Sequence, residues 1–236
     1  MRGVRTIECS SLQWLLPGIC LLFAGCATQT LFKSNFATPV GQPPPHAQQV
    51  GTANIYGQTG NVIDVALPPP VAGNWVRIGR PDALASEQAF QGVTTGYQGP
   101  GTYTFSMSLL MPTGTGLATI QLEPVGQSIN VFGSFLHLDL MEDNTVRIDD
   151  DDSTKFGKFP RDELFVLQVT LTVNATPTAN IALSGASTQM TPMSKDFTIQ
   201  PFAIPLAQQF GAVRLWMGLP WQGAFYAQNI VVTKNQ

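Results

Sequence analysis

Residues 134–152 read SFLHLDLMEDNTVRIDDDD, and this stretch decides the fold. Leucines alternate with His137 and Asp139 across Leu136–Leu140, and a period of two is typical of a strand with one buried face. The polar residues 142–145 indicate a turn, and the alternation resumes at Val146–Ile148. The stretch therefore predicts an antiparallel β-hairpin whose leucine face packs into a core and whose loop has four or five residues.

Strand patterns recur from residue 50 onward, with turn signals between them. The clearest is Leu164–Val173, and the segment after the turn at 174–177 returns as its hairpin partner. Further strands are expected at 61–67, 74–78, 103–109, 117–123, 213–217 and 227–232, and helical turns only at 82–90 and 204–210. Ten or more half-apolar strands with so little helix predict an all-β domain, a two-sheet antiparallel β-sandwich.

The composition supports this fold class and excludes one class of partner. Only 11% of the residues are charged, whereas about 25% is usual. Glycine occurs 22 times and proline 18 times, which is typical of a turn-rich extracytoplasmic β protein. The formal net charge is −3 and no run of Lys or Arg occurs, so the sequence predicts no nucleic-acid partner.

Residues 1–25 have the form of a secretory signal peptide. Two arginines precede an apolar stretch at 12–25, which is too short to span a bilayer as a helix. The motif Phe23-Ala24-Gly25-Cys26 resembles the lipobox of bacterial lipoproteins, with Phe where Leu is usual. An ordinary cleaved signal with a chance cysteine is the alternative. Cysteines occur only at positions 9, 20 and 26, so Cys26 would be the one left after cleavage.

The lipobox resemblance implies that Cys26 carries a diacylglyceryl thioether and an acylated amine, which would hold the protein on a membrane. Ala27 in the next position implies the outer membrane if the source has one, and in any case the cell envelope. Residues 26–49 then read as a lipidated cysteine and an extended tether, and residues 50–236 as a single β-sandwich domain. Three apolar residues of this tether could pack onto the domain: Leu31, Phe32 and Phe36.

The order of strands resembles the concanavalin A-like jelly roll of laminin-G-type modules, legume lectins and laminarinase-type glucanases. The resemblance is carried by residues 102–109 and 135–140 as paired long strands, by Leu164–Val173 with its return to 185, and by the closing 225–232. That closing run, FYAQNIVV, is similar to the Tyr-x-Asp-Asn-Ile-x-Val end of such modules, with Gln228 where Asp is usual. The resemblance implies a jelly roll but fixes no function.

The laminarinase-type catalytic motif is not reproduced. Those enzymes carry Glu-x-Asp-x-x-Glu, whereas this chain has His137-Leu-Asp139-Leu-Met-Glu142, and a histidine cannot form the glycosyl ester. Whether the protein is an enzyme stays uncertain, and a non-enzyme is favoured. A jelly-roll hydrolase or lyase would require Asp139, Glu142 and Glu123 to share one cleft.

The densest charge of the chain lies at residues 149–152, with further carboxylates at 142 and 143. One interpretation is a Ca²⁺ site formed by Asp149, Asp151 and Asp143, because Ca²⁺ takes six to eight oxygen ligands. The other is a solvated acidic loop that nearby basic residues neutralise in part. The basic residues are Arg147, Lys155, Lys158 and Arg161.

A polar sheet face bearing tryptophan is the remaining candidate for function. An exposed Trp beside Arg and Asp can stack on a sugar ring and hydrogen-bond its hydroxyl groups. Alternatively, Trp216 closes the end of the core. The sequence favours a lipid-anchored module that binds a glycan or an envelope partner, over a structural or assembly lipoprotein that meets a protein through a sheet edge. The candidate ligand residues are His137, Asp139, Gln168, Arg214 and Trp216, expected on one face with Ser106 and Thr170.

Overall fold

The computed structural model describes residues 28–36, 50, 52–56, 64–66, 73–80, 88–94, 99–124, 134–187, 190, 192–199, 210–217 and 221–235. Over these residues the chain forms fifteen strands and no helix, which confirms the all-β prediction. In this part of the chain no helix is therefore long and apolar enough to cross a membrane. The signal peptide, Cys26 and residues 37–49 lie outside the described residues.

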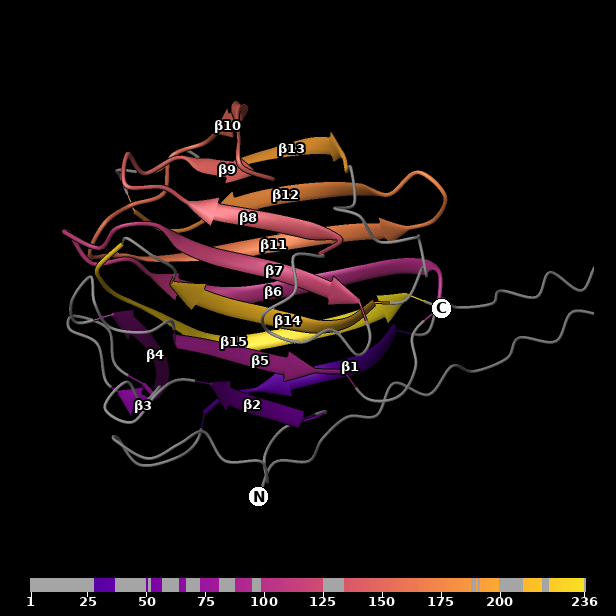
Figure 1. Ribbon diagram of the computed structural model, residues 1–236, viewed down its shortest axis with the longest axis horizontal. Helices are drawn as coiled ribbons and strands as arrows, with labels where there is room; N and C mark the ends of the chain where they lie inside the picture. Colours follow the sequence, from indigo (N-terminus) through magenta and orange to yellow (C-terminus); the bar gives the residue numbers. More distant parts are fainter. Residues whose placement is uncertain are drawn as a thin grey trace, which may run out of the picture.

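Two antiparallel sheets are layered face to face (Figure 1). The eight-stranded sheet has the order β13 (Met193–Thr198), β12 (Thr178–Ser184), β11 (Leu164–Val173), β6 (Gly101–Leu110), β15 (Gly223–Asn235), β4 (Trp75–Arg80) and β3 (Asp64–Ala66), and β1 (Thr28–Ser34) also pairs with β15. The seven-stranded sheet has the order β10 (Asp151–Phe156), β9 (Val146–Ile148), β8 (Leu136–Leu140), β7 (Ala118–Pro124), β14 (Phe210–Met217), β5 (Gln88–Val93) and β2 (Thr52–Tyr56). The predicted two-sheet sandwich is confirmed.

The two hairpins expected from the sequence are present. In the first, Leu138 lies opposite Ile148 and Leu140 opposite Val146, and all four side chains are buried between the sheets. In the second, β11 pairs with β12 over its full return. Because alternate residues of every long strand face the same core, the period-two pattern predicted these elements correctly.

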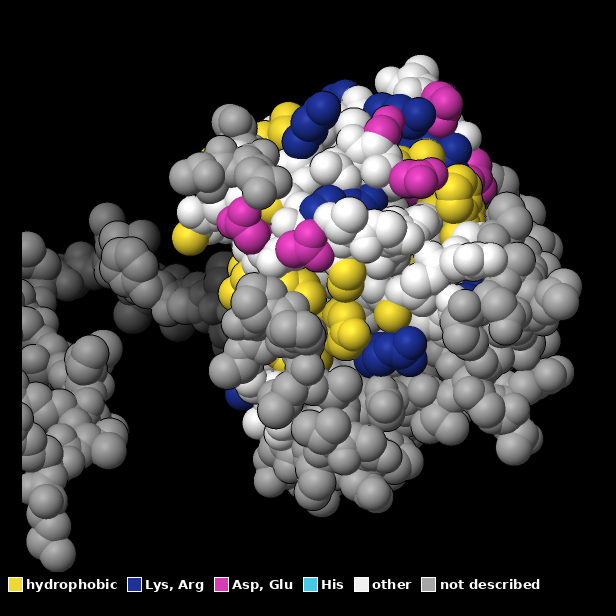
Figure 2. Space-filling view, turned by 90° about the vertical axis from the view of Figure 1, so that its left-hand side faces the viewer, with side chains coloured by type: hydrophobic (Ala, Val, Ile, Leu, Met, Phe, Trp, Pro, Cys, Tyr) yellow, Lys and Arg dark blue, Asp and Glu magenta, His cyan; other side chains and the backbone are white. Residues whose placement is uncertain are grey.

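The molecule has two distinct ends. At the terminal end, Thr28 pairs with Asn235, and the β11–β12 turn at 174–177 lies on the same side (Figure 1). The loop end carries the turns at 112–116, 142–145 and 157–163, which are joined by hydrogen bonds such as Phe159 N to Asn144 O at 2.9 Å. Figure 2 looks onto the loop end and shows basic and acidic side chains distributed across it.

The predicted boundary between tether and domain is wrong for residues 28–36. This segment contains β1, which pairs with the last strand of the chain, β15. Leu31, Phe32 and Phe36 are fully buried, so they pack onto the domain as the sequence suggested. The physical reason is Gly92 on β5, where an added Cβ would lie only 2.7 Å from the Phe32 ring, so the ring occupies space that a side chain would need.

Four further expectations are corrected. The helical turn expected at 82–90 is wrong for its last residues, because β5 begins at Gln88 and pairs with both β14 and β2. The other expected turn, 204–210, is wrong for Phe210, which begins β14, and residues 82–87 and 204–209 lie outside the described residues. The acidic stretch is only partly a loop, since β10 begins at Asp151 and pairs with β9. β13 was not expected, because its outer residues are exposed and show no alternation.

Candidate functional site

The outer face of the eight-stranded sheet carries an ordered array of small uncharged side chains. Along one row of the strand register, Thr172 lies opposite Thr178 on one side and Thr102 on the other. In the next row, Thr170 lies opposite both Asn180 and Thr104. Neighbouring strands are about 4.8 Å apart, so each row places hydroxyl and amide groups at regular intervals.

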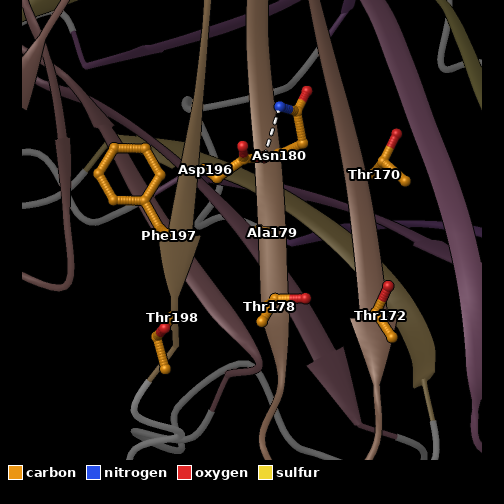
Figure 3. A pocket seen from close by; sticks show the side chains of 8 residues that line it. All are labelled: Thr170, Thr172, Thr178, Ala179, Asn180, Asp196, Phe197 and Thr198. Atoms are coloured by element: carbon orange, nitrogen blue, oxygen red, sulfur yellow. Dashed lines mark hydrogen bonds between the residues drawn. The ribbon is translucent and has the colours of Figure 1, made fainter.

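A pocket of about 390 Å³ opens over β11, β12 and β13 on this face. We call it the threonine pocket, and its polar side chains point outward from the three strands (Figure 3). Asn180 Nδ2 donates to Asp196 Oδ1 at 2.7 Å, and Ser194 Oγ donates to Asn180 Oδ1 at 3.0 Å, so the amide is held in one orientation. The pocket is lined by Thr170, Thr172, Thr178, Ala179, Asn180, Asp196, Phe197 and Thr198.

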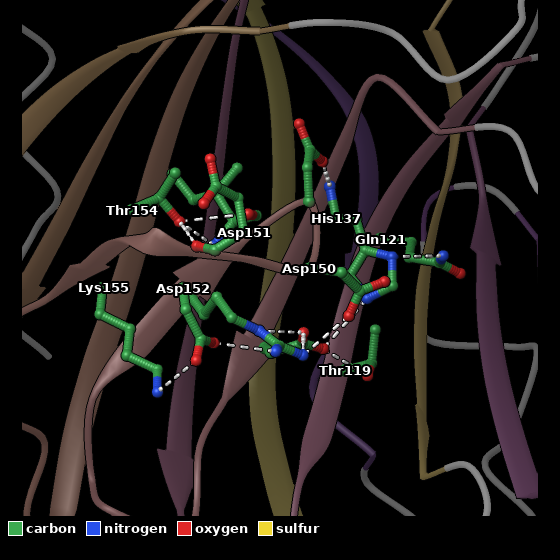
Figure 4. A network of polar contacts seen from close by, with 12 residues as sticks. Thr119, Gln121, His137, Asp150, Asp151, Asp152, Thr154 and Lys155 are labelled. Atoms are coloured by element: carbon green, nitrogen blue, oxygen red, sulfur yellow. Dashed lines mark hydrogen bonds and ion pairs between the residues drawn. The ribbon is translucent and has the colours of Figure 1, made fainter.

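The outer face of the seven-stranded sheet differs, because its polar side chains contact each other and are largely buried. Along one row of the register, Trp216 lies opposite Thr119, Thr119 opposite Asp139, and Asp139 opposite Arg147. In the adjacent row, Arg214 lies opposite Gln121, and Gln121 lies opposite His137. The two rows cross four strands, and Gln91 of a fifth strand, β5, lies opposite Arg214. Figure 4 shows the part of this network around His137.

Asp139 is the centre of this network. Its Oδ2 accepts hydrogen bonds from Arg147 Nη2 at 2.7 Å and Nε at 3.1 Å. Its Oδ1 accepts one from Thr119 Oγ1 at 2.9 Å and lies 3.0 Å from His137 Nε2. Burial acts to raise the pKa of Asp139, but the hydrogen bonds and charges of these partners outweigh burial and lower it. With 1% of its surface exposed and both oxygens occupied, Asp139 is not accessible to a substrate.

His137 and Asp149 are the titratable groups beside this centre. Burial acts to lower the pKa of His137, but its contact with Asp139 prevails and raises it. Burial also raises the pKa of the Asp149 carboxyl to about 6, although the backbone N–H of His137 donates to Asp149 Oδ1 at 3.3 Å. Of these two groups, the Asp149 carboxyl is therefore the one whose pKa lies in the mildly acidic range.

The other end of the network surrounds Glu123. Gln91 Nε2 donates to Glu123 Oε2 at 2.7 Å, and Arg214 Nη1 lies 3.6 Å from Glu123 Oε1. Burial raises the pKa of Glu123 against these partners. The Arg214 guanidinium carbon lies 4.9 Å from the centre of the Trp216 ring, a cation–π contact. These contacts of Arg214 are thus with neighbours in its own sheet.

The structure brings together four of the five residues expected to bind a ligand. His137, Asp139, Arg214 and Trp216 share the outer face of the seven-stranded sheet. Gln168 does not join them, because it pairs with Ser106 and lies on the outer face of the other sheet. The expectation of one common face was wrong, since alternation along a strand tells which residues share a side but not which sheet the strand enters.

The three carboxylates expected to hold Ca²⁺ do not converge. Asp143 Oδ1 accepts from Thr145 N at 3.0 Å, Asp151 Oδ1 accepts from Ser153 N at 2.8 Å, and Asp149 contacts the backbone of His137. Asp143 and Asp151 therefore each stabilise their own turn, whereas Asp149 joins its turn to β8. Among the described residues, the group that could hold a metal ion is instead His137, Asp139 and Asp150, whose ligand atoms lie within 4.8 Å of one another.

This group fits Ca²⁺ poorly. Arg147 Nη2 lies 2.7 Å from both Asp139 Oδ2 and Asp150 Oδ1, so a guanidinium already occupies the space between the carboxylates. Ca²⁺ requires six to eight oxygen ligands, and a histidine nitrogen is not among them. In the structure, Arg147 supplies the positive charge that a metal ion would supply.

Sequence reasoning did not identify the threonine pocket. The motifs Thr-x-Thr at 102–104 and 170–172 are visible signals of two hydroxyl groups on one strand face. The strand register that places Asn180 beside Asp196, 16 residues apart, is fixed by pairing between strands and is not readable from either strand alone.

No family model matches this chain, and no curated protein matches it. Solved structures do. The lectin UEA-II complexed with galactose superposes with a TM-score of 0.50 and 10% sequence identity, over 88% of this chain and 98% of that lectin. Peanut lectin with a nine-residue peptide gives a TM-score of 0.50 and 12% identity, over 89% of this chain and 98% of that one. These likenesses show the fold: the chain is a concanavalin A-like β-sandwich.

Proposed function

We propose that this protein is a non-catalytic carbohydrate-binding module, anchored to a cell-envelope membrane through lipid on Cys26, and that sugar binds in the threonine pocket. The lectin-like fold supports the class, since one similar structure holds galactose. At 10% identity that likeness carries no site residues across. The location of the site is therefore argued from this chain's own side chains.

The observation that carries the proposal is the chemistry of the threonine pocket. Four threonines, one asparagine and one aspartate line it, and no basic side chain does so among the described residues. Hydroxyl, amide and carboxylate groups can donate to and accept from sugar hydroxyl groups in both directions. The volume of about 390 Å³ lies in the range of small-ligand sites.

The outer face of the seven-stranded sheet is the less suitable sugar site. Most of its donors and acceptors are buried and bonded to each other, from Gln91 through Asp139 to Arg147, and Trp216 Nε1 is an exception. A ligand there would have to replace hydrogen bonds that the protein already makes, which gives little net free energy. The threonine hydroxyls of the other sheet face solvent at intermediate or full exposure.

Glycan-array screening of the purified chain, followed by calorimetric titration of the best neutral oligosaccharide, tests the binding. We expect Asn180→Ala and Asp196→Asn each to weaken binding roughly tenfold or more, because each removes or weakens a polar contact at the pocket. Ser106→Ala, on the same sheet face but outside the pocket, is the matched control and should bind normally. Absence of any bound glycan would remove the proposal, and unchanged binding in both pocket variants would move the site elsewhere.

The anchor is tested separately by growing the producing cells with labelled palmitate. Label should appear in the wild-type protein and be lost in Cys26→Ser, with the protein released from the membrane fraction. Label that persists in Cys26→Ser would contradict lipidation at this residue. Because β1 begins at Thr28, Ala27 alone separates Cys26 from the sandwich, so the proposed anchor would hold the domain close to the bilayer.

A further inference from the structure

A second pocket lies at the loop end of the molecule and differs in charge from the first. Its volume is about 320 Å³, and it opens between β4, the start of β15 and the 112–116 turn. We call it the arginine pocket, because Arg77 and Arg80 both line it. The described residues that line it include no Asp or Glu, so its walls carry net positive charge.

Arg77 provides the accessible cation. It lies opposite Tyr226 in the register of β4 and β15 and opposite Asp64 in that of β3 and β4, it is half-buried, and no hydrogen bond or ion pair joins its guanidinium to a side chain that the structure describes. A Cβ on Gly79 would lie 3.1 Å from Arg77 Nη2 and 2.9 Å from the Ala224 Cβ. The missing side chain at Gly79 therefore leaves the space in which this guanidinium lies.

Arg80 places a second charge behind the first. Its side chain is fully buried, and Nη1 donates to the carbonyl oxygen of Trp221 at 3.3 Å. Its guanidinium therefore forms part of the inner wall of the pocket. In a chain with only 12 basic residues, two arginines in one pocket of this size are a concentrated charge.

The neighbouring Arg161 stabilises a turn beside the pocket. Its Nη1 donates to the carbonyl oxygens of Pro112 and Thr115, so it fixes the turn that forms one wall. Asp162, the acidic residue next to the rim, accepts hydrogen bonds from Thr113 N at 2.9 Å and Thr113 Oγ1 at 2.6 Å. The charges of Arg161 and Asp162 oppose each other, so this pair adds little net charge beside the pocket.

We infer that the arginine pocket binds an oxyanion, either a carboxylate or a phosphate group, carried by a small molecule or by an acidic glycan. A guanidinium presents N–H donors in a planar fork that matches both groups, and such charge-assisted hydrogen bonds are stronger than neutral ones. The site is separate from the threonine pocket, which lies over β11 to β13 near the terminal end. It would therefore add a second ligand to the proposed module.

Calorimetric titration of the full chain with inorganic phosphate, glucuronate and glucose tests this inference. Phosphate or glucuronate should bind and glucose should not, and raising the NaCl concentration should weaken the binding. Arg77→Gln should weaken it roughly tenfold or more, because a charge-assisted contact is lost. Lys33→Gln removes the same charge from an exposed position on β1 and should leave binding unchanged.

Each outcome decides the inference. Binding of phosphate alone points to a phosphorylated ligand, and binding of glucuronate alone points to an acidic sugar, so either result supports the site. Binding of neither anion, or equal binding by the wild type and Arg77→Gln, overturns it. Asn180→Ala should bind the anion like the wild type, so that a failure of the threonine pocket does not count against the arginine pocket.

Discussion

Arg147 acts as an internal cation on the outer face of the seven-stranded sheet. Its guanidinium contacts Asp139 and Asp150 at 2.7 Å and Asp152 at 3.2 Å. The first of these carboxylates is buried, and a buried carboxylate without a partner is strongly destabilising. The planar fork of one arginine thus joins β8, β9 and the acidic turn without a metal ion.

Removing this side chain should therefore destabilise the fold. We expect Arg147→Ala to lower the free energy of unfolding by about 3 kcal/mol, since Asp139 stays buried with one oxygen unpaired. Lys155→Ala is the control, because its ion pairs with Asp143 and Asp152 are exposed to solvent and contribute little to stability. Urea unfolding at pH 7 measures both variants, and equal losses would contradict this role for Arg147.

The same variant tests the relation between Arg147 and Ca²⁺. Millimolar Ca²⁺ should leave the Tm of the wild type unchanged, because the guanidinium already neutralises the carboxylates. It should raise the Tm of Arg147→Ala, in which Asp139, Asp150 and Asp152 become free to coordinate an ion. A higher wild-type Tm with Ca²⁺, reversed by a chelator, would show that the ion binds despite the arginine.

Asp149 should make stability depend on pH. Burial raises its pKa from 3.8 to about 6, so between these values the folded protein binds more protons than the unfolded chain. Stability from this group is full below pH 4 and falls as the pH rises to about 6. Asp149→Asn should keep the contact with the His137 backbone and gain roughly 1 kcal/mol at pH 8, after allowance for partial exposure. Urea unfolding from pH 4 to 8 measures it, and a wild-type slope retained in the variant would contradict the assignment.

At the scale of elements, β1 is an integral strand. Phe32 packs edge-on against Phe90, as does Phe36, with ring centres 6.2 and 5.6 Å apart. Phe32→Ala should lower the free energy of unfolding by about 3–5 kcal/mol, the usual cost of emptying an aromatic core site. Lys33→Ala, the exposed neighbour, should change it by less than about 0.5 kcal/mol. If urea unfolding showed only a small loss of unfolding free energy for Phe32→Ala, this segment would be a tether rather than an integral strand.

How far the sequence predicted the elements depends on how each strand is buried. β11 has a strictly alternating burial pattern and was predicted to the residue. β10 and β13 are edge strands with runs of exposed residues, and such strands carry no period-two signal. The first residues of β5, 88–90, were mistaken for the end of a helical turn, because residues 89–92 are all buried and so show no alternation.

The candidate sites were less predictable than the strands, because they depend on register. His137 and Asp139 were expected to be polar and outward-facing, and they are, but nothing in their own strand indicates that Arg147 fills the space beside them. The two pockets depend on pairs such as Asn180 with Asp196 and Arg77 with Tyr226, which are 16 and 149 residues apart. Residues this far apart in the sequence come together only when their strands pair in the folded sheet.

At the scale of the whole molecule, the outer faces of the two sheets differ in how their polar side chains are arranged. On the outer face of the seven-stranded sheet most polar side chains bond to each other, whereas the eight-stranded sheet carries both pockets on its side of the sandwich. The threonine pocket lies near the terminal end and the arginine pocket at the loop end. A long polymer with both neutral and acidic groups could contact both.

The proposed anchor fixes how this face meets its surroundings. Thr28 follows Cys26 by two residues, a reach of about 7 Å, so the terminal end should face the bilayer and the loop end should face away. A fluorophore on Ala175→Cys, in the β11–β12 turn, should then be quenched by lipid-borne quenchers in vesicles carrying the lipidated protein. The same fluorophore on Glu142→Cys, exposed at the loop end, should not be. Equal quenching at both positions would mean that a longer flexible segment separates the lipid from β1, and the arginine pocket would lose its outward orientation.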